Sequence, residues 1–163
     1  MKNVVTLVVL LFLTANVFSQ SNKLTIKGNI SDTSNIGLAT VKIDIYQDGK
    51  LIQTKTTASN GMYKIDSLAL EHVYQFHFSK DGYCYKIAEL TAKSTTDKKM
   101  EGTFPLEISS SLFNVTKKKA RKLKFLKTEP IAKAKYNAEL DNIEWDVTYI
   151  EMMKVKVDAI KRK

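Results

Sequence analysis

The most distinctive chemical feature of the sequence is a run of cations. Between positions 117 and 127, seven side chains are basic: Lys117, Lys118, Lys119, Arg121, Lys122, Lys124 and Lys127. Because like charges repel, these side chains must lie in solvent or against an anion. The run therefore predicts either a solvated loop or hairpin, or a binding patch for lipid headgroups, an anionic glycan or an acidic protein.

A second segment is rich in carboxylates, at Glu139, Asp141, Glu144 and Asp146. Paired carboxylates can hydrolyse glycosides or hold a hard cation. The spacing lacks the central glycine and terminal glutamate of a calcium loop, and a chain of this size leaves little room for a glycosidase cleft. Helix capping explains Asp141 and Glu144 more simply, so we expect no metal and no cofactor here.

The histidines and the single cysteine do not form a catalytic set. His72 and His77 are separated by an odd number of positions, which places them on opposite faces of a strand, where they would not share a metal. Cys84 lies between two tyrosines in an apolar segment, and one thiol cannot form an internal disulfide. We expect Cys84 to be a packing residue and the protein not to be an enzyme.

Residues 1–19 have the pattern of a secretory signal peptide. Lys2 precedes an apolar run from Val4 to Val17, and cleavage is expected between Ser19 and Gln20. The run is about 14 residues, whereas a membrane-spanning helix needs roughly 20, so we expect no transmembrane segment after cleavage. The expected location is the periplasm or the cell exterior. There, the formal charge of +9 favours anionic envelope components over nucleic acid.

Residues 23 to about 92 show the alternation of short β-strands. Apolar side chains alternate with polar ones, as in Val41, Ile43 and Ile45, and three Asp-Gly or Asn-Gly pairs mark tight turns at 48–49, 60–61 and 81–82. Alternation with frequent turns predicts an antiparallel β-sandwich in which one face of each sheet is buried.

The same region resembles the carboxypeptidase regulatory-like domain. Gly61 with Tyr63, and Gly82 with Tyr83, stand at the turn positions of that family, with the alternating strand Tyr74–Phe78 between them. The resemblance implies a transthyretin-like β-sandwich over residues 20–100, without catalytic residues, that serves as a folding or interaction module. Pro130–Lys133 and Glu144–Asp146 resemble segments of small exported envelope proteins of Gram-negative bacteria.

Residues 101–163 are predicted to form a C-terminal extension. It comprises an edge strand containing Pro105, the basic hairpin or loop, a strand near 130–136 and a helix over about 144–161. Asp141-Asn142-Ile143-Glu144 resembles a capping box for that helix. The amphipathic pattern places Trp145, Tyr149 and Met152 on its contact face, against the sandwich or a partner, and a terminal strand is the alternative.

These features favour a non-enzymatic, exported envelope protein that acts as a protein-interaction or structural module. Its partner would be another envelope protein or an anionic envelope component. One alternative is a carbohydrate-binding module, which would need Tyr46 and Tyr85 exposed side by side. Another is a small hydrolase, which would need Glu144, Asp146 or Cys84 next to a histidine.

Overall fold

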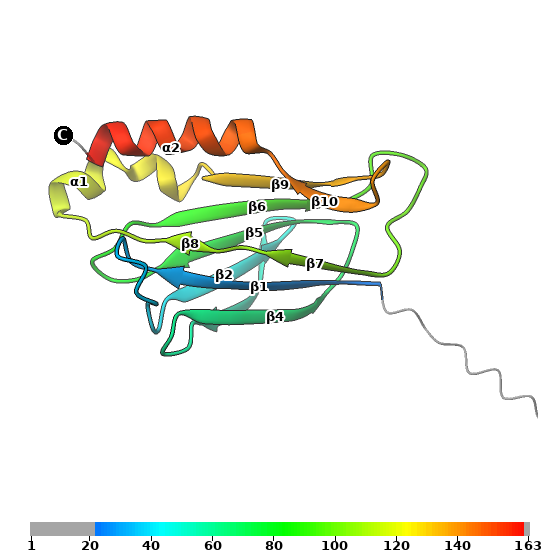
Figure 1. Cartoon of the computed structure of the whole chain (residues 1–163), viewed down its shortest axis with the longest axis horizontal. Coiled ribbons are helices and arrows are strands. Elements are labelled where there is room, and N and C mark those ends of the chain that lie inside the picture. Colours follow the sequence, from blue (N-terminus) through cyan, green and yellow to red (C-terminus); the bar gives the residue numbers. More distant parts are fainter. Residues whose placement is uncertain (1–21, 162–163) are drawn as a thin grey trace, which may run out of the picture.

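The computed structural model describes residues 22–161, which form two β-sheets packed face to face, with helices along one side (Figure 1). The predicted signal peptide and its cleavage site at Ser19–Gln20 lie outside the described residues. Within residues 22–161, no helix combines the length and the apolar character needed to cross a bilayer. The predicted β-sandwich with a C-terminal strand and amphipathic helix is confirmed.

The smaller sheet is centred on β1 (Lys23–Ser31). It has β4 (Met62–Leu68) on one side and β7 (Thr103–Glu107) and β8 (Ser110–Ser111) on the other. β1 pairs antiparallel with β4 and parallel with β7 and β8. Pro105 lies in β7 at the edge of the sheet, where a residue without an N–H is tolerated.

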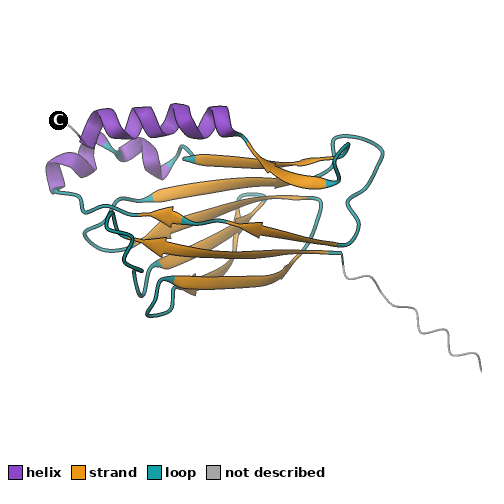
Figure 2. Ribbon diagram, in the orientation of Figure 1, coloured by secondary structure: helices purple, strands orange, loops and turns teal. Residues whose placement is uncertain are grey.

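The larger sheet has the strand order β10–β9–β6–β5–β2–β3, in which β9 joins β6 in parallel. Its strands are β2 (Lys42–Gln47), β3 (Lys50–Thr56), β5 (His72–Ser79), β6 (Lys86–Ala92), β9 (Ala132–Asn137) and β10 (Asn142–Trp145). Residues after 101 therefore add strands to both sheets (Figure 2). The domain boundary near residue 100 stays a prediction.

The core lies between the sheets because apolar residues occupy every second position. In the larger sheet Ile43, Ile45 and Phe76 are fully buried, and Leu24 and Ile26 of β1 are buried opposite them. Positions between these residues point to the outer face of their sheet. This alternation fixes which side chains of β2, β5 and β6 can form a surface site.

The turn between β2 and β3 has the predicted geometry. Asp48 and Gly49 have φ values of 48° and 79°, as a two-residue hairpin turn requires. The Asp48 carboxylate also accepts a hydrogen bond from the N–H of Val73 and contacts Nδ1 of His72 in β5. Asp48 therefore joins the turn to the neighbouring strand.

We expect Asp48→Asn to flatten the acid limb of the stability curve. The hydrogen bond from the Val73 N–H, followed by that from His72, lowers the pKa of Asp48 below its ordinary value. A lowered folded-state pKa contributes stability above about pH 4, and this contribution is lost as the pH falls through the folded-state value. Thermal melts between pH 6 and pH 2.5 measure the slope, and parallel curves for the two proteins would contradict the assignment.

The predicted basic hairpin or loop is wrong, because the structure has helix in this segment. Residues 117–122 form α1 (Lys117–Lys122) and residues 124–127 form the 3₁₀ helix η1 (Lys124–Lys127). Thr116 caps α1 by accepting a hydrogen bond from the N–H of Lys119. Leu123 and Leu126 are buried, and they anchor the segment to the sandwich.

The C-terminal helix, α2 (Val147–Lys161), begins later than the capping-box pattern predicted. Trp145 lies in β10 rather than in the helix, because residues 142–145 pair with β9 in a hairpin. Asp146 accepts the hydrogen bond from the N–H of Tyr149 that an N-cap residue would accept.

The contact face of α2 differs from the predicted one. Met153 and Val157 are its buried residues, whereas Met152 is 55% exposed. Tyr149 is partly buried and donates its hydroxyl hydrogen to the carbonyl oxygen of Pro130. The helix therefore packs through the face of Met153 and Val157, and Trp145, the predicted anchor of the other face, belongs to β10 instead.

Candidate functional site

A pocket of about 560 Å³ opens where the helical segment meets the larger sheet. This volume lies within the usual range for small-molecule sites. The start of β2, the connection between β5 and β6, and the segment α1–η1 line it: Thr40, Lys42, Ser79, Lys80, Asp81, Gly82, Tyr83, Cys84, Tyr85, Val115, Ala120, Leu123 and Lys127. Its wall is therefore both apolar and basic.

Three lysines but only one carboxylate, Asp81, line this pocket. Lys80 is held in place, because its Nζ donates to the carbonyl oxygen of Ala39 at 2.8 Å. Lys42 forms an ion pair of 2.7 Å with Asp44 on the outer face of β2. Lys127 is exposed, and no carboxylate of residues 22–161 pairs with it. The excess of cations favours an anionic group in the pocket.

An aromatic row extends from the pocket across the outer face of the larger sheet. Tyr85 accepts or donates a 2.6 Å hydrogen bond at Nδ1 of His77, and Tyr46 packs on the other side of the same imidazole at 4.4 Å between ring centroids. The interplanar angles are 33° for Tyr46 and 86° for Tyr85, so the rings do not form one flat platform. All three residues are partly buried.

The environment of His77 favours a neutral imidazole. Burial lowers the pKa of His77 below its ordinary value, while the nearby Asp44 carboxylate acts in the opposite direction. Burial also raises the pKa of Tyr85, so its hydroxyl stays protonated at neutral pH. His77 and Tyr85 therefore offer neutral hydrogen-bonding groups beside the basic pocket.

Polar side chains continue this row toward the C-terminal strands. Gln75 lies between the His77 Nε2 and the Glu89 carboxylate, with contacts of 3.2 and 2.9 Å. Glu89 pairs in turn with Lys133 of β9 at 3.4 Å. Ring contacts, hydrogen bonds and an ion pair thus connect side chains from β2 to β9 along one face of the sheet.

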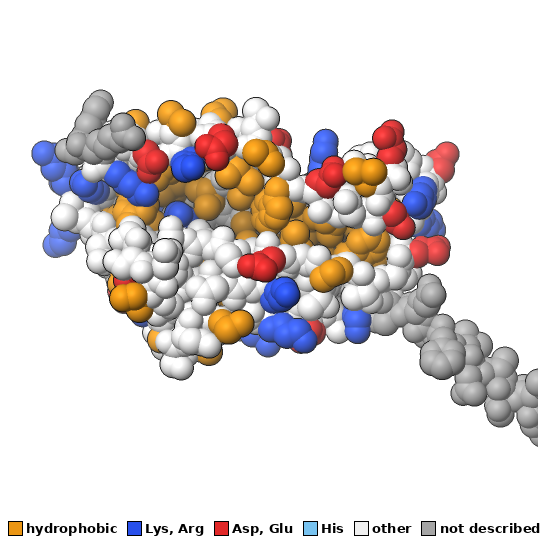
Figure 3. Space-filling model, viewed as in Figure 1, with side chains coloured by type: hydrophobic (Ala, Val, Ile, Leu, Met, Phe, Trp, Pro, Cys, Tyr) orange, Lys and Arg blue, Asp and Glu red, His pale blue; other side chains and the backbone are white. Residues whose placement is uncertain are grey.

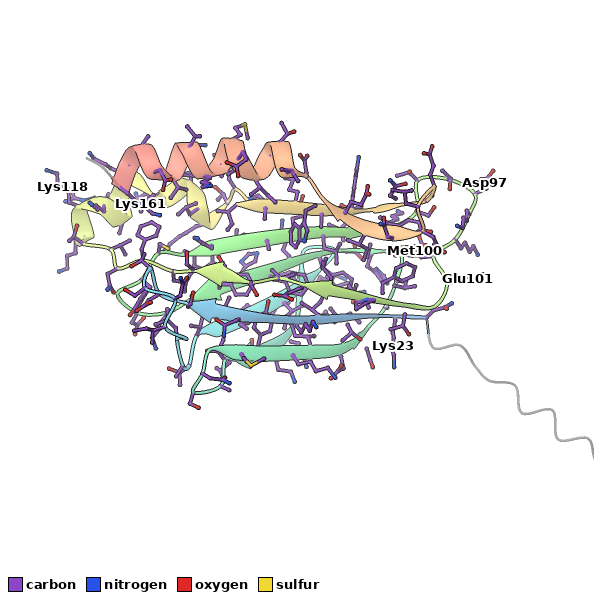
Figure 4. The ribbon with its side chains drawn as sticks, in the orientation of Figure 1. Lys23, Asp97, Met100, Glu101, Lys118 and Lys161 are labelled. Carbon is purple, nitrogen blue, oxygen red and sulfur yellow. The ribbon has the colours of Figure 1, made fainter. Side chains whose placement is uncertain are left out.

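The seven predicted cations all lie on α1, η1 and the residues beside them, and six of them are exposed; Lys119 is partly buried. Lys119 donates from Nζ to the carbonyl oxygen of Lys161 at the end of α2. Figure 4 shows Lys118 at the outer end of α1. We call Lys117, Lys118, Lys119, Arg121, Lys122, Lys124 and Lys127 the basic surface.

Ion pairs are missing across the whole basic surface, whereas the other lysines of residues 22–161 include both paired and unpaired ones. No carboxylate among residues 22–161 forms an ion pair with any of its seven members, whereas ion pairs form at seven lysines elsewhere: Lys42, Lys64, Lys98, Lys133, Lys154, Lys156 and Lys161. The basic surface is therefore a continuous group of cations without a carboxylate partner in residues 22–161.

The remaining predicted candidates do not converge on a reactive centre. The Asp141 carboxylate accepts the Tyr136 hydroxyl hydrogen at 2.6 Å, and Glu144 accepts a bond from the Asn137 amide, so both stabilise the hairpin of β9 and β10. Within residues 22–161, histidine, cysteine and acidic side chains form no group of three that could hold a metal ion. Cys84 is buried, with no histidine among its hydrogen-bond partners in the described part of the chain.

We expect Cys84 to be almost unreactive in the folded protein. The residue is only 2% exposed, and burial raises the pKa of its thiol, so little thiolate forms and reagents reach it poorly. Reaction with a disulfide reagent at pH 8 should therefore be at least about tenfold slower than in denaturant. Equal rates in the two conditions would show that the thiol is accessible.

Sequence reasoning identified the basic surface but missed the pocket beside it. Tyr46 and His77 were both predicted to face outward, yet only the pairing of β2 with β5, in which Asp44 lies opposite His77, brings them together. Lys80 carries no sequence signal of its own. The alternation of outward residues on adjacent strands was the one signal that could have suggested the aromatic row.

Comparisons with known proteins show distant likeness in fold. No family model matches the sequence, and no curated protein matches it. Similar solved structures include 3-chlorocatechol 1,2-dioxygenase from Rhodococcus opacus 1CP (13% identity, 58% of this chain and 60% of that chain, TM-score 0.44), a streptococcal ancillary pilin (14%, 60% and 34%, 0.41) and the Bacillus anthracis TIE protein (17%, 57% and 17%, 0.44). This chain covers three fifths or less of the length of each. The protein is thus similar to β-sandwich proteins in fold alone.

Proposed function

We propose that this protein is a non-enzymatic binding module of the cell envelope, which contacts an anionic partner through its basic surface. The observation that supports this function is that seven cations stand within eleven consecutive residues and none of them forms an ion pair in the described part of the chain. The proposal includes export to the periplasm or the cell exterior through the N-terminal signal peptide. It also includes membership of the carboxypeptidase regulatory-like family.

The basic surface is arranged at a cost to local stability. The helix dipole gives no clear net cost, because α1 has only six residues and the cations of its last turn, Lys119, Arg121 and Lys122, are favourably placed. Pairs such as Lys117 with Arg121, and Lys118 with Lys122, place like charges four residues apart. An anionic surface held against α1 would reduce this like-charge repulsion, so the arrangement is more consistent with binding than with solubility.

The test measures attachment to the envelope fraction of producing cells by sedimentation. The wild-type protein should bind at 50 mM salt and be released at 500 mM. A variant with Lys117, Lys118, Arg121 and Lys122 replaced by Gln should bind at least about tenfold more weakly, because each cation near an anionic surface contributes about 1 kcal/mol.

The matched control replaces four lysines distant from α1, at Lys27, Lys50, Lys55 and Lys64, with Gln. It makes the same change in net charge on exposed strands. It should keep most of the attachment. If both variants lose binding equally, net charge and not the basic surface is responsible, and if neither loses binding, the proposal is wrong.

A saccharide is the second candidate ligand. The observation that favours it is the position of Tyr46 and Tyr85 on one face, joined by His77, next to a pocket of suitable volume. Tyr85→Ala should then weaken retention on immobilised acidic polysaccharide while leaving attachment to anionic phospholipid vesicles unchanged. Unchanged retention on the polysaccharide would remove the carbohydrate alternative.

A further inference from the structure

A second hollow lies on the other side of the helices, between α2 and the strands of the smaller sheet. Figure 3 shows hydrophobic side chains exposed along a furrow in this region. A groove of about 340 Å³ lies here. Ile131 and the α2 residues Ile150, Met153 and Val157 provide its apolar wall, and Ser109–Ser111 and Lys86 lie across from them.

Lys86 differs from the other cations of this groove. Lys154 pairs with Glu151 at 3.6 Å and Lys161 pairs with Asp158 at 3.2 Å, whereas Lys86 has no ion pair with a carboxylate of residues 22–161. Its Nζ donates to the carbonyl oxygen of Ser111 at 2.6 Å and contacts Ser110 Oγ at 3.4 Å. An ammonium group has three donors, so one N–H has no partner within the described part of the chain.

The surroundings of Lys86 disfavour an unpaired charge. Burial lowers the pKa of Lys86. Cys84 and Asp158 act in the opposite direction, whereas the nearby Lys161 ammonium acts in the same direction as burial. A buried cation without an anionic partner costs stability, and this cost falls when an anion binds beside it. The groove thus combines an apolar wall with a cation that lacks a counter-ion.

From these contacts we infer that the groove between α2 and β8 binds a small amphiphilic acid. The carboxylate would bind the Lys86 ammonium, and the hydrocarbon chain would lie against Ile150, Met153 and Val157. The volume is at the lower end of the range for small-molecule sites, which suits one short chain better than a peptide. This site is separate from the basic surface, and its ligand does not depend on the function proposed above.

The test is calorimetric titration of the full chain with octanoate and with octan-1-ol, which share a tail and differ in the head group. Octanoate should bind the wild-type protein about tenfold or more tightly than the alcohol. Its carboxylate forms an ion-paired hydrogen bond with the Lys86 ammonium, whereas the neutral hydroxyl of the alcohol does not. Lys86→Met should abolish that preference while keeping the weak binding of the alcohol. A short peptide with a C-terminal leucine should bind more weakly than octanoate.

Lys154→Met is the matched control, because it makes the same chemical change at a residue that lines the groove and is already ion-paired. It should keep the preference for octanoate. Ile150→Gln should lower the affinity for octanoate and for octan-1-ol to a similar extent, because Ile150 is partly exposed and contributes only to the apolar wall. The inference would be overturned if octanoate did not bind at millimolar concentration, or if Lys86→Met kept the preference for octanoate over octanol. Tighter binding of the peptide than of octanoate would show that the groove binds a peptide instead.

Discussion

Gly61→Ala should destabilise the protein by about 3 kcal/mol or more, whereas Gly82→Ala should cost only about 1 kcal/mol. The two glycines have nearly identical positive φ values, 79° and 81°, so the strain of placing an L-residue there is the same. Their surroundings differ. A Cβ at Gly61 would overlap the carbonyl oxygen of Ile30 and lie 2.8 Å from the Cα of Gly37, whereas a Cβ at Gly82 would meet no atom within 4 Å.

Chemical denaturation of both variants measures the difference. The backbone of the turn at Gly61 and that of the loop before β2 are in direct contact, and the Gly61 carbonyl accepts a hydrogen bond from the N–H of Ile30. Neither side of this contact is a flexible side chain that could move aside. Equal losses of unfolding free energy for the two variants would show that only the φ value matters at position 61.

Leu126→Ala should cost about 2–5 kcal/mol and should also loosen the basic surface. Leu126 is fully buried, although it stands between Lys124 and Lys127, and it belongs to the core cluster together with Leu123. Truncation would leave a cavity under η1, next to β6. Denaturant unfolding gives the loss of stability, and limited trypsin digestion reports the loosening, because the segment is rich in cleavage sites.

Leu140→Ala is the control for that substitution. Leu140 is 62% exposed in the turn between β9 and β10, so the same truncation there should change stability by less than about 0.5 kcal/mol. A similar small effect at Leu126 would mean that the helical segment is not anchored by this side chain.

The strands were predictable because their residues follow one local pattern, in which apolar and polar side chains alternate between tight turns. Alternation placed Ile43, Ile45 and Phe76 in the core, and the Asp48-Gly49 pair marked a turn whose φ values the structure reproduces. These signals depend only on neighbours a few positions away. Burial of one face and the geometry of a tight turn leave few alternatives.

The two errors in the C-terminal part have different physical causes. Leu123 and Leu126 have helical spacing, but seven surrounding cations made the segment look like a solvated loop. Trp145 has a capping pattern before it, yet its pairing opposite Ala134 in β9 places it in a strand. At Trp145 tertiary pairing overrides the local capping signal. In α1 the residues are good helix formers, Thr116 caps them and none is buried, so local propensity itself favours the helix.

The candidate sites depend on contacts that no local pattern contains. The row of Tyr46, His77 and Tyr85 requires the register of three strands, and the pocket beside it also requires α1 and η1. Lys86 was not singled out at all, since one lysine at a strand start is unremarkable until α2 covers it. Only the charge of the basic surface could be read directly from the residues that form it.

The parallel pairing of β1 with β7 has a consequence for how the chain folds. These partners are about 80 residues apart, so the first strand gains its β4 neighbour early but lacks its second neighbour until residues 103–107 are available. The larger sheet is likewise incomplete until β9 has been synthesised, because β6 pairs with β9 from Ala132 onward. Pairings this distant impose a large loop-closure entropy and slow the folding transition. A newly made chain would therefore stay unfolded for longer than one built from hairpins alone.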